Sequence, residues 1–190
     1  MVRRAGRLDV RQMAELLNEI AGAGGTAVVP RAVTADELYG SMRRHRDTGA
    51  WHVAEDECGT ILGFQYIEPQ GDLPPEACNI ATFVRPGRSG LDIGSALFEA
   101  STKAARALGY RWIGADIRAD NHGGLIYYQS RGFEAHGRVA GQNEVAGKRR
   151  MRYDLSAGNG IRRARERNRI ARTMAMFRQF HRMPFQNARA

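Results

Sequence analysis

The segment 85–108 constrains the fold of this chain most strongly, because it combines a turn-rich loop with the start of a long helix. The residues over 78–84 alternate in the manner of a strand, which a Pro-Gly pair ends. Apolar residues then recur at helical spacing over 93–108. Backbone N–H groups at a helix start have no helical partner, and the helix dipole favours anions there. The segment therefore predicts a site for a phosphate-bearing ligand; the alternative is a tight connection that needs Gly90 and Gly94 only for backbone freedom.

Turn residues and hydrophobic periodicity divide the rest of the chain into short helices and strands. Asp9 with Gln12, and Thr34 with Glu37, form capping-box patterns that predict the starts of two early helices. The element order predicts an α/β (α+β) fold with a mainly antiparallel first half and one parallel step in the middle. The other expected elements are a strand at 2–5, helices at 10–20 and 35–48, a hairpin at 51–67, a strand at 111–117, a short helix at 120–132, and strands at 133–139 and 149–155.

The net charge of +9 is concentrated at the C-terminal end, where nine Arg stand against one Glu over 156–190. We expect a domain over 1–155 and a basic amphipathic helical extension over 156–190. The extension has three possible uses: docking on the domain or in a homodimer, nucleic-acid binding through phosphates, or contact with an anionic membrane surface. Its large apolar side chains, among them Phe177 and Phe180, favour docking in a homodimer.

Two cysteines, Cys58 and Cys78, are too few for a disulfide scaffold or a metal cluster. The sequence shows no signal-peptide pattern and no apolar stretch of membrane-spanning length. We therefore expect a cytoplasmic protein with reduced thiols, no bound metal and no membrane span. Cys78 is expected to be a small core residue.

Two blocks of the sequence, SGLDIGSAL over 89–97 and NHGGLIYYQSRGF over 121–133, resemble motifs of the GNAT N-acetyltransferase family. The block 89–97 (SGLDIGSAL) resembles the acyl-CoA loop, whose pattern is Gln/Arg-x-x-Gly-x-Gly/Ala. The block 121–133 resembles the pattern Asn-x-x-Ala-x-x-Leu-Tyr-x-x-x-Gly-Phe. Three residues depart from these patterns: Ser89 replaces Gln or Arg, Asp92 replaces the first Gly, and Gly124 replaces Ala. The order of the elements also agrees, so the resemblance covers roughly residues 2–155.

The resemblance implies a central mixed, mostly antiparallel sheet flanked by helices, with parallel strands splayed at the acyl-CoA site. It implies transfer of an acetyl group from acetyl-CoA to a primary amine, with Tyr128 protonating the leaving thiolate as general acid. Backbone donors exposed at a strand bulge are expected to polarise the thioester carbonyl. The implied cofactor-binding residues are Phe83, Val84, Ser89, Gly90, Leu91, Asp92, Ile93, Gly94, Ser95 and Asn121.

Several roles remain open at this point. Tyr128 also fits a packed aromatic residue, and Asn121 also fits a plain helix N-cap. The acceptor is expected to be a small amine or an amino acid, as in the phosphinothricin acetyltransferase subgroup. The alternatives are a protein Lys or N-terminus as acceptor, or a non-catalytic protein that binds CoA or nucleic acid. The general base is unassigned among four candidates: His52, Glu68, Glu76 and Asp116.

Overall fold

The computed structural model describes residues 1–23, 32–87, 91–139 and 147–156. Within these residues it contains the helices and strands that the sequence predicts, and it confirms the mixed α/β fold. The predicted helical extension lies outside the described residues, apart from its first position, and stays a prediction. The elements are β1 (Val2–Arg4), η1 (Arg7–Asp9), α1 (Val10–Gly22), α2 (Ala35–Arg44), β2 (Ala50–Glu55), β3 (Ile61–Glu68), β4 (Ala77–Val84), α3 (Leu91–Ala107), β5 (Trp112–Arg118), α4 (His122–Ser130), β6 (Glu134–Val139) and β7 (Lys148–Asp154).

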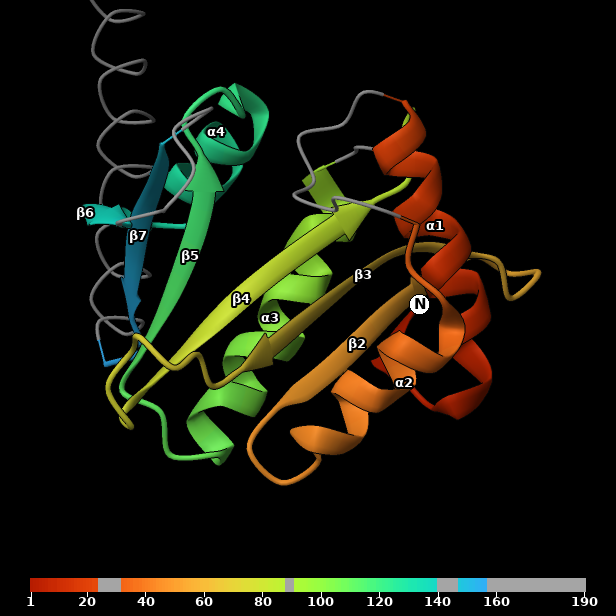
Figure 1. The fold of residues 1–190 in the computed structure, drawn as a ribbon, viewed down its shortest axis with the longest axis horizontal. Coiled ribbons are helices and arrows are strands. Elements are labelled where there is room, and N and C mark those ends of the chain that lie inside the picture. The colour runs from red at the N-terminus through yellow and green to blue at the C-terminus, as the bar shows by residue number, and fades with distance from the viewer. Residues whose placement is uncertain (24–31, 88–90, 140–146, 157–190) are drawn as a thin grey trace, which may run out of the picture. The chain divides into compact units, whose positions relative to one another are not determined.

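The described strands form one seven-stranded sheet in the order β1-β2-β3-β4-β5-β7-β6. Neighbouring strands run antiparallel except for β4 and β5, which are parallel and are connected through α3. The last of the described strands along the chain, β7, lies between β5 and β6. The pairing of β4 with β5 covers only three positions, from Ala77↔Trp112 to Asn79↔Gly114. Beyond Asn79 the two strands diverge, as Figure 1 shows.

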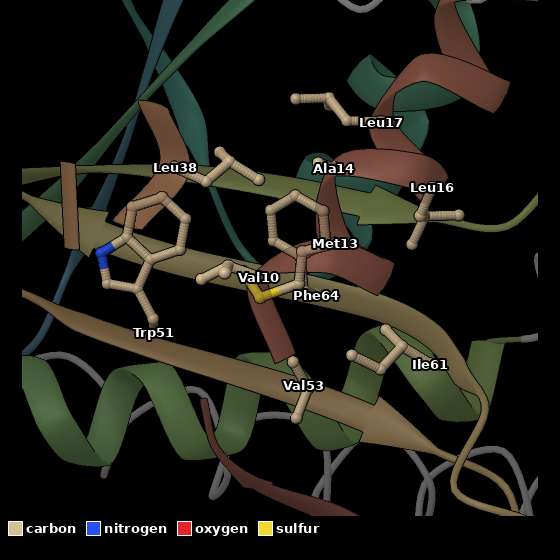
Figure 2. Packing of buried hydrophobic residues seen from close by; sticks show 10 residues of the cluster. All are labelled: Val10, Met13, Ala14, Leu16, Leu17, Leu38, Trp51, Val53, Ile61 and Phe64. Atoms are coloured by element: carbon tan, nitrogen blue, oxygen red, sulfur yellow. The ribbon is translucent and has the colours of Figure 1, made fainter. Parts of the chain in front are cut away.

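Helices α1 and α2 cover one face of the sheet, and α3 packs against β2 and β3 on the other face (Figure 1). The amphipathic stripe of α1 supplies half of the buried cluster on the first face, as its periodicity predicts. Figure 2 shows these side chains meeting those of β2 and β3. The cluster consists of Val10, Met13, Ala14, Leu16, Leu17, Leu38, Trp51, Val53, Ile61 and Phe64.

A second group of buried rings connects α3, α4 and β7 on the opposite face. The ring of Phe98 meets the edge of Tyr153 with centroids 5.2 Å apart, and Phe133 lies 5.3 Å from Tyr153. Tyr128 packs edge-on against Phe133 at 4.9 Å. These contacts fix α4 relative to the sheet and so determine where its tyrosines lie.

The N-terminal ends of the two early helices differ in how they are capped. Thr34 and Glu37 form the predicted capping box. Asp9 does not cap α1: its carboxylate accepts hydrogen bonds from the backbone N–H of Gly6 at 2.7 Å and from the Arg3 guanidinium at 2.8 Å. The side chain of Gln12 accepts instead from the N–H of Ile61. The predicted box at Asp9 was therefore wrong, because tertiary partners compete for both side chains. Among the described residues, no helix is long and apolar enough to cross a membrane.

Candidate functional site

The divergence of β4 from β5 exposes one edge of β4. The register between β3 and β4 runs without a shift from Gly63↔Val84 to Glu68↔Asn79, so the expected bulge in β4 is absent. The divergence creates an opening between β4 and β5. It arises because β5 pairs with β7 along its whole length but stops pairing with β4 after Gly114. The backbone groups of β4 beyond Asn79 therefore have no strand partner on that side among the described strands.

Strand alternation identifies which backbone groups face this opening. The N–H of Arg85, just after β4, donates to the carbonyl of Leu62 on the β3 side at 2.8 Å. Because successive residues of a strand point their backbone groups to opposite sides, the N–H groups of Val84 and Thr82 face the opening. The N–H of Phe83 faces β3 instead. The sequence did not single out Thr82, since the side-chain pattern carries no signal for the direction of a backbone amide.

The helix α3 begins beside the end of β4. Ser89 and Gly90, two of the expected phosphate-binding residues, lie outside the described residues. Leu91 opens α3, and Asp92 is exposed in its first turn. Ile93 is half-buried and packs close to Gly63 on β3. The unpaired N–H groups of this first turn lie at the carboxyl end of β4, which is the arrangement that favours an anionic ligand.

Gly94 lets α4 pack directly against the first turn of α3. A Cβ atom at this position would lie 2.7 Å from the ring of Tyr127. The Tyr127 hydroxyl donates to the carbonyl of Gly94 at 2.8 Å. The next residue, Ser95, is half-buried on α3. The small residue in the family pattern therefore has a local packing reason in this chain.

Tyr128 extends from α4 to β4. Its side chain is buried, and its hydroxyl lies 2.9 Å from the Thr82 Oγ1 atom. The Gln65 side chain donates to the same Thr82 oxygen at 2.7 Å. Three polar side chains are therefore linked by hydrogen bonds on the face of the sheet opposite to α1 and α2. Burial raises the pKa of Tyr128, and the hydrogen bond with Thr82 opposes this shift. The phenol therefore stays protonated at neutral pH and holds a proton beside the exposed edge of β4.

Asn121 caps α4. Its Oδ1 atom accepts from the backbone N–H of Gly124 at 2.8 Å, which is the N-cap geometry that the sequence left as one alternative. A Cβ atom at position 124 would lie 2.7 Å from the Asn121 Nδ2 atom. An alanine at this position would therefore require the Asn121 side chain to shift.

Two of the four candidate bases are engaged elsewhere. Asp116 accepts two hydrogen bonds from the Arg150 guanidinium, both at 2.7 Å, and a third from Gln70 at 3.0 Å. His52 lies on the α3 face, where its Nδ1 atom is 3.3 Å from the Ser101 hydroxyl. Burial lowers the pKa of His52, so its ring is neutral at physiological pH.

The other two candidates are glutamates with different surroundings. Glu76 is exposed at the end of the loop before β4. Glu68 is half-buried at the end of β3, where it is the cross-strand neighbour of Asn79. Burial raises the pKa of the Glu68 carboxyl. Cys78, also on β4, is fully buried, and burial raises the pKa of its thiol to about 12, so it is an inert core residue as expected. Among the described residues, no group of His, Cys, Asp and Glu side chains could hold a metal ion.

Comparison with known proteins identifies a family. The model of the acetyltransferase (GNAT) family matches residues 11–133, which include α1 to α4 and the opening between β4 and β5. No curated protein sequence matches the chain.

Several solved structures share the fold. A ribosomal-protein-alanine N-acetyltransferase from Brucella melitensis superposes with a TM-score of 0.72 at 20% identity, over 81% of this chain and 99% of that one. A phosphinothricin acetyltransferase from Sinorhizobium meliloti, solved with acetyl-CoA, has a TM-score of 0.70 at 20% identity, over 84% and 90% of the two chains. A chimeric spermidine N-acetyltransferase from Vibrio cholerae has a TM-score of 0.67 at 17% identity, over 82% and 95%.

Proposed function

This chain belongs to the GNAT acetyltransferase family, and we propose that it transfers the acetyl group of acetyl-CoA to a primary amine of a small molecule or an amino acid. The family uses acetyl-CoA as its co-substrate, and the described residues fit that group. The observation that carries the proposal is the early divergence of β4 from β5 beside the start of α3. This divergence places two sets of backbone donors at one end of the sheet, one along the edge of a strand and one at the start of a helix. Such an arrangement suits a ligand with a carbonyl at one end and a diphosphate at the other.

The roles of the chain's own groups follow from where they lie. When bound, acetyl-CoA supplies the acetyl thioester. The N–H groups of Thr82 and Val84 polarise a carbonyl at the edge of β4. The first turn of α3, together with the preceding loop that contains Ser89 and Gly90, binds the diphosphate through backbone N–H groups. Tyr128 holds a proton at its phenolic oxygen and gives it to the departing sulfur as general acid.

The remaining predicted contacts have supporting roles in this proposal. Leu91, Ile93 and Ser95 belong to the start of α3, and their backbone groups help to form the diphosphate site. Asp92 points its charge to solvent, where it is exposed. Asn121 supports the site by capping the helix that carries Tyr128.

The solved structures that share the fold include enzymes named for three kinds of acceptor, so the first experiment compares these three acceptors. Thiol release from acetyl-CoA is measured with phosphinothricin, with spermidine and with a peptide that begins with alanine. We expect the fastest release with phosphinothricin, because Asn18-Glu19-Ile20 and Gly25-Thr26, which precede the second early helix, resemble the sequence of that subgroup. Faster release with the peptide would favour a protein N-terminus as acceptor. No thiol release with any of the three would overturn the proposed function.

We also propose that the protein is a cytoplasmic homodimer. Cys58 is exposed and unpaired and Cys78 is buried and unpaired, which suits a reducing compartment. The apolar side chains of residues 156–190 support docking between two copies, and this segment also offers arginines to a nucleic acid. Light scattering on the full chain and on residues 1–155 tests the assembly: we expect a dimer for the first and a monomer for the second. A monomer for both would overturn it.

A further inference from the structure

Two buried oxygen atoms on neighbouring strands lack hydrogen-bond partners. Glu68 on β3 and Asn79 on β4 are opposite each other in the antiparallel register. The Oε2 atom of Glu68 and the Oδ1 atom of Asn79 are both buried, and neither has a hydrogen-bond partner among the described residues. An acceptor buried without a donor costs roughly 1–3 kcal/mol, so one such atom calls for an explanation. Two such acceptors on cross-strand neighbours lie where one ligand can donate to both.

This pair lies at the base of the opening that the proposed function uses. Asn79 is the last residue of β4 that pairs with β5, and the strand edge bearing Thr82 and Val84 begins just beyond it. Its side chain is on the same face as Tyr66, which stacks against Trp51 in the core under α1 and α2. The pair therefore faces away from Tyr128, which hydrogen-bonds Thr82 on the other face.

The surroundings of Glu68 come from the C-terminal end of α2 and from its own strand. Burial raises the pKa of its carboxyl, whereas His45, which follows α2, and Ser41 and Arg44 of α2 oppose that shift. Burial also raises the pKa of Tyr66, to which the Glu68 charge adds. Glu68 is thus a base whose proton affinity is higher than that of an exposed glutamate.

We propose that Glu68 and Asn79 bind the nitrogen of the acceptor, and that Glu68 Oε2 removes its proton. The inference rests on the proposed function. A ligand that brings N–H donors satisfies both acceptor oxygens, and a primary ammonium group carries three such donors. An N–H bond of the ammonium breaks, the proton goes to Glu68 Oε2, and the electron pair stays on nitrogen as the nucleophile. An amine has a pKa of about 10, so this step is needed at neutral pH.

The first test compares Glu68→Gln with the unchanged protein, using whichever of phosphinothricin, spermidine or the alanine peptide reacts fastest. We expect kcat/KM for that amine to fall about 100-fold. Activity of the unchanged protein should fall as the pH drops through the pKa of Glu68, and this acid limb should be missing in the variant. Coenzyme A affinity, measured by calorimetry, should stay unchanged. Glu57→Gln, an exposed glutamate in the β2–β3 turn, is the matched control and should behave as the unchanged protein.

A second variant keeps the inference testable if Glu68→Gln does not fold. Asn79→Asp places a second carboxylate beside Glu68, which raises its pKa further and moves the acid limb to higher pH. If the unchanged protein transfers the acetyl group and Glu68→Gln transfers it at the same rate, this inference alone is overturned. The same holds if the unchanged protein is active and Asn79→Asp leaves the acid limb at its original pH. No transfer by the unchanged protein would overturn the proposed function, and the inference with it.

Discussion

Tyr128 and Tyr127 are adjacent in sequence, yet their hydroxyls make different hydrogen bonds. The Tyr128 hydroxyl lies 2.9 Å from the Thr82 Oγ1 atom on β4, whereas the Tyr127 hydroxyl donates to the Gly94 carbonyl on α3 and accepts from the Gln65 side chain at 3.4 Å. Because a helix turns by 100° per residue, two successive side chains on α4 point in different directions. We therefore assign the proposed general-acid role to Tyr128, and Tyr127 connects α4 to α3.

Tyr128→Phe is expected to lower kcat about 100-fold, because it removes the proton donor and leaves the ring packing in place. Coenzyme A binding, followed by calorimetry, should be unchanged. Tyr127→Phe is the control and should retain most of the activity. If Tyr127→Phe loses more activity than Tyr128→Phe, the assignment of the general acid is contradicted.

Gly94→Ala tests the close contact between α3 and α4. The added Cβ would meet the Tyr127 ring at 2.7 Å, so α4 must shift or the variant is strained. We expect the free energy of unfolding to fall by about 1–3 kcal/mol, together with lower activity. Gly40→Ala, in an exposed helical position with no neighbour within 4 Å, is the matched control. Thermal unfolding should show it to be up to about 1 kcal/mol more stable.

At the scale of elements, β1 is held to the rest of the fold by a charged cluster. Arg3 donates to the carboxylates of Asp9 and of Glu55 on β2. The hydrogen bond from Arg3 keeps the pKa of Asp9 below its usual value, and burial opposes this. A carboxyl whose pKa is lower in the folded state stabilises the fold above its unfolded pKa of about 3.9, and this contribution is lost as the pH falls through the folded value.

Asp9→Asn is expected to lower the free energy of unfolding at pH 7 by roughly 1–3 kcal/mol. The difference from the unchanged protein should shrink as the pH falls from about 4 through the lower folded-state pKa of Asp9, because below that value both proteins lack the charge. Glu15→Gln is the control: its exposed pair with Arg11 is worth at most about 0.5 kcal/mol. Urea unfolding at several pH values measures both variants, and a pH-independent difference for Asp9→Asn would contradict the account.

The elements themselves were predictable from the sequence because each has a clear periodicity and clear ends. The stripe on α1 and the Thr34 capping box are examples of such local signals. Strand pairing was not predictable, since β7 lies between β5 and β6 through contacts that no local pattern encodes. The early end of the β4–β5 ladder, which creates the site, has the same tertiary origin.

The candidate site was partly predictable from the sequence. The motif located the start of α3 and the tyrosine that faces β4. The sequence predicts Phe83 and Val84 as backbone donors, whereas the register turns the Phe83 amide toward β3 and the Thr82 amide toward the opening, which no side-chain pattern can indicate. The sequence also left Glu68 undistinguished among four candidate bases. Only the fold shows that both carboxylate oxygens of Asp116 accept hydrogen bonds from Arg150, while one carboxylate oxygen of Glu68 has no hydrogen-bond partner among the described residues.

At the scale of the whole molecule, the family model matches residues 11–133, and the Brucella melitensis structure shares the fold over 81% of the chain. The co-substrate is expected to bind at the end of the sheet where β4, α3 and α4 meet, and the acceptor nitrogen is expected to arrive from the face under α1 and α2. In this proposal, Tyr128 and Glu68 lie on opposite faces of the sheet.

Coenzyme A titrated into isotopically labelled protein, followed through backbone amide NMR signals, tests the central claim most directly. The account predicts saturable shifts of the Thr82, Val84 and Gly94 amides, with a dissociation constant of about 1 mM or tighter. Amides at the far end of the sheet, such as that of Gly49, should stay in place. Absence of shifts at millimolar coenzyme A, or shifts that leave Thr82 and Val84 unmoved, would contradict it.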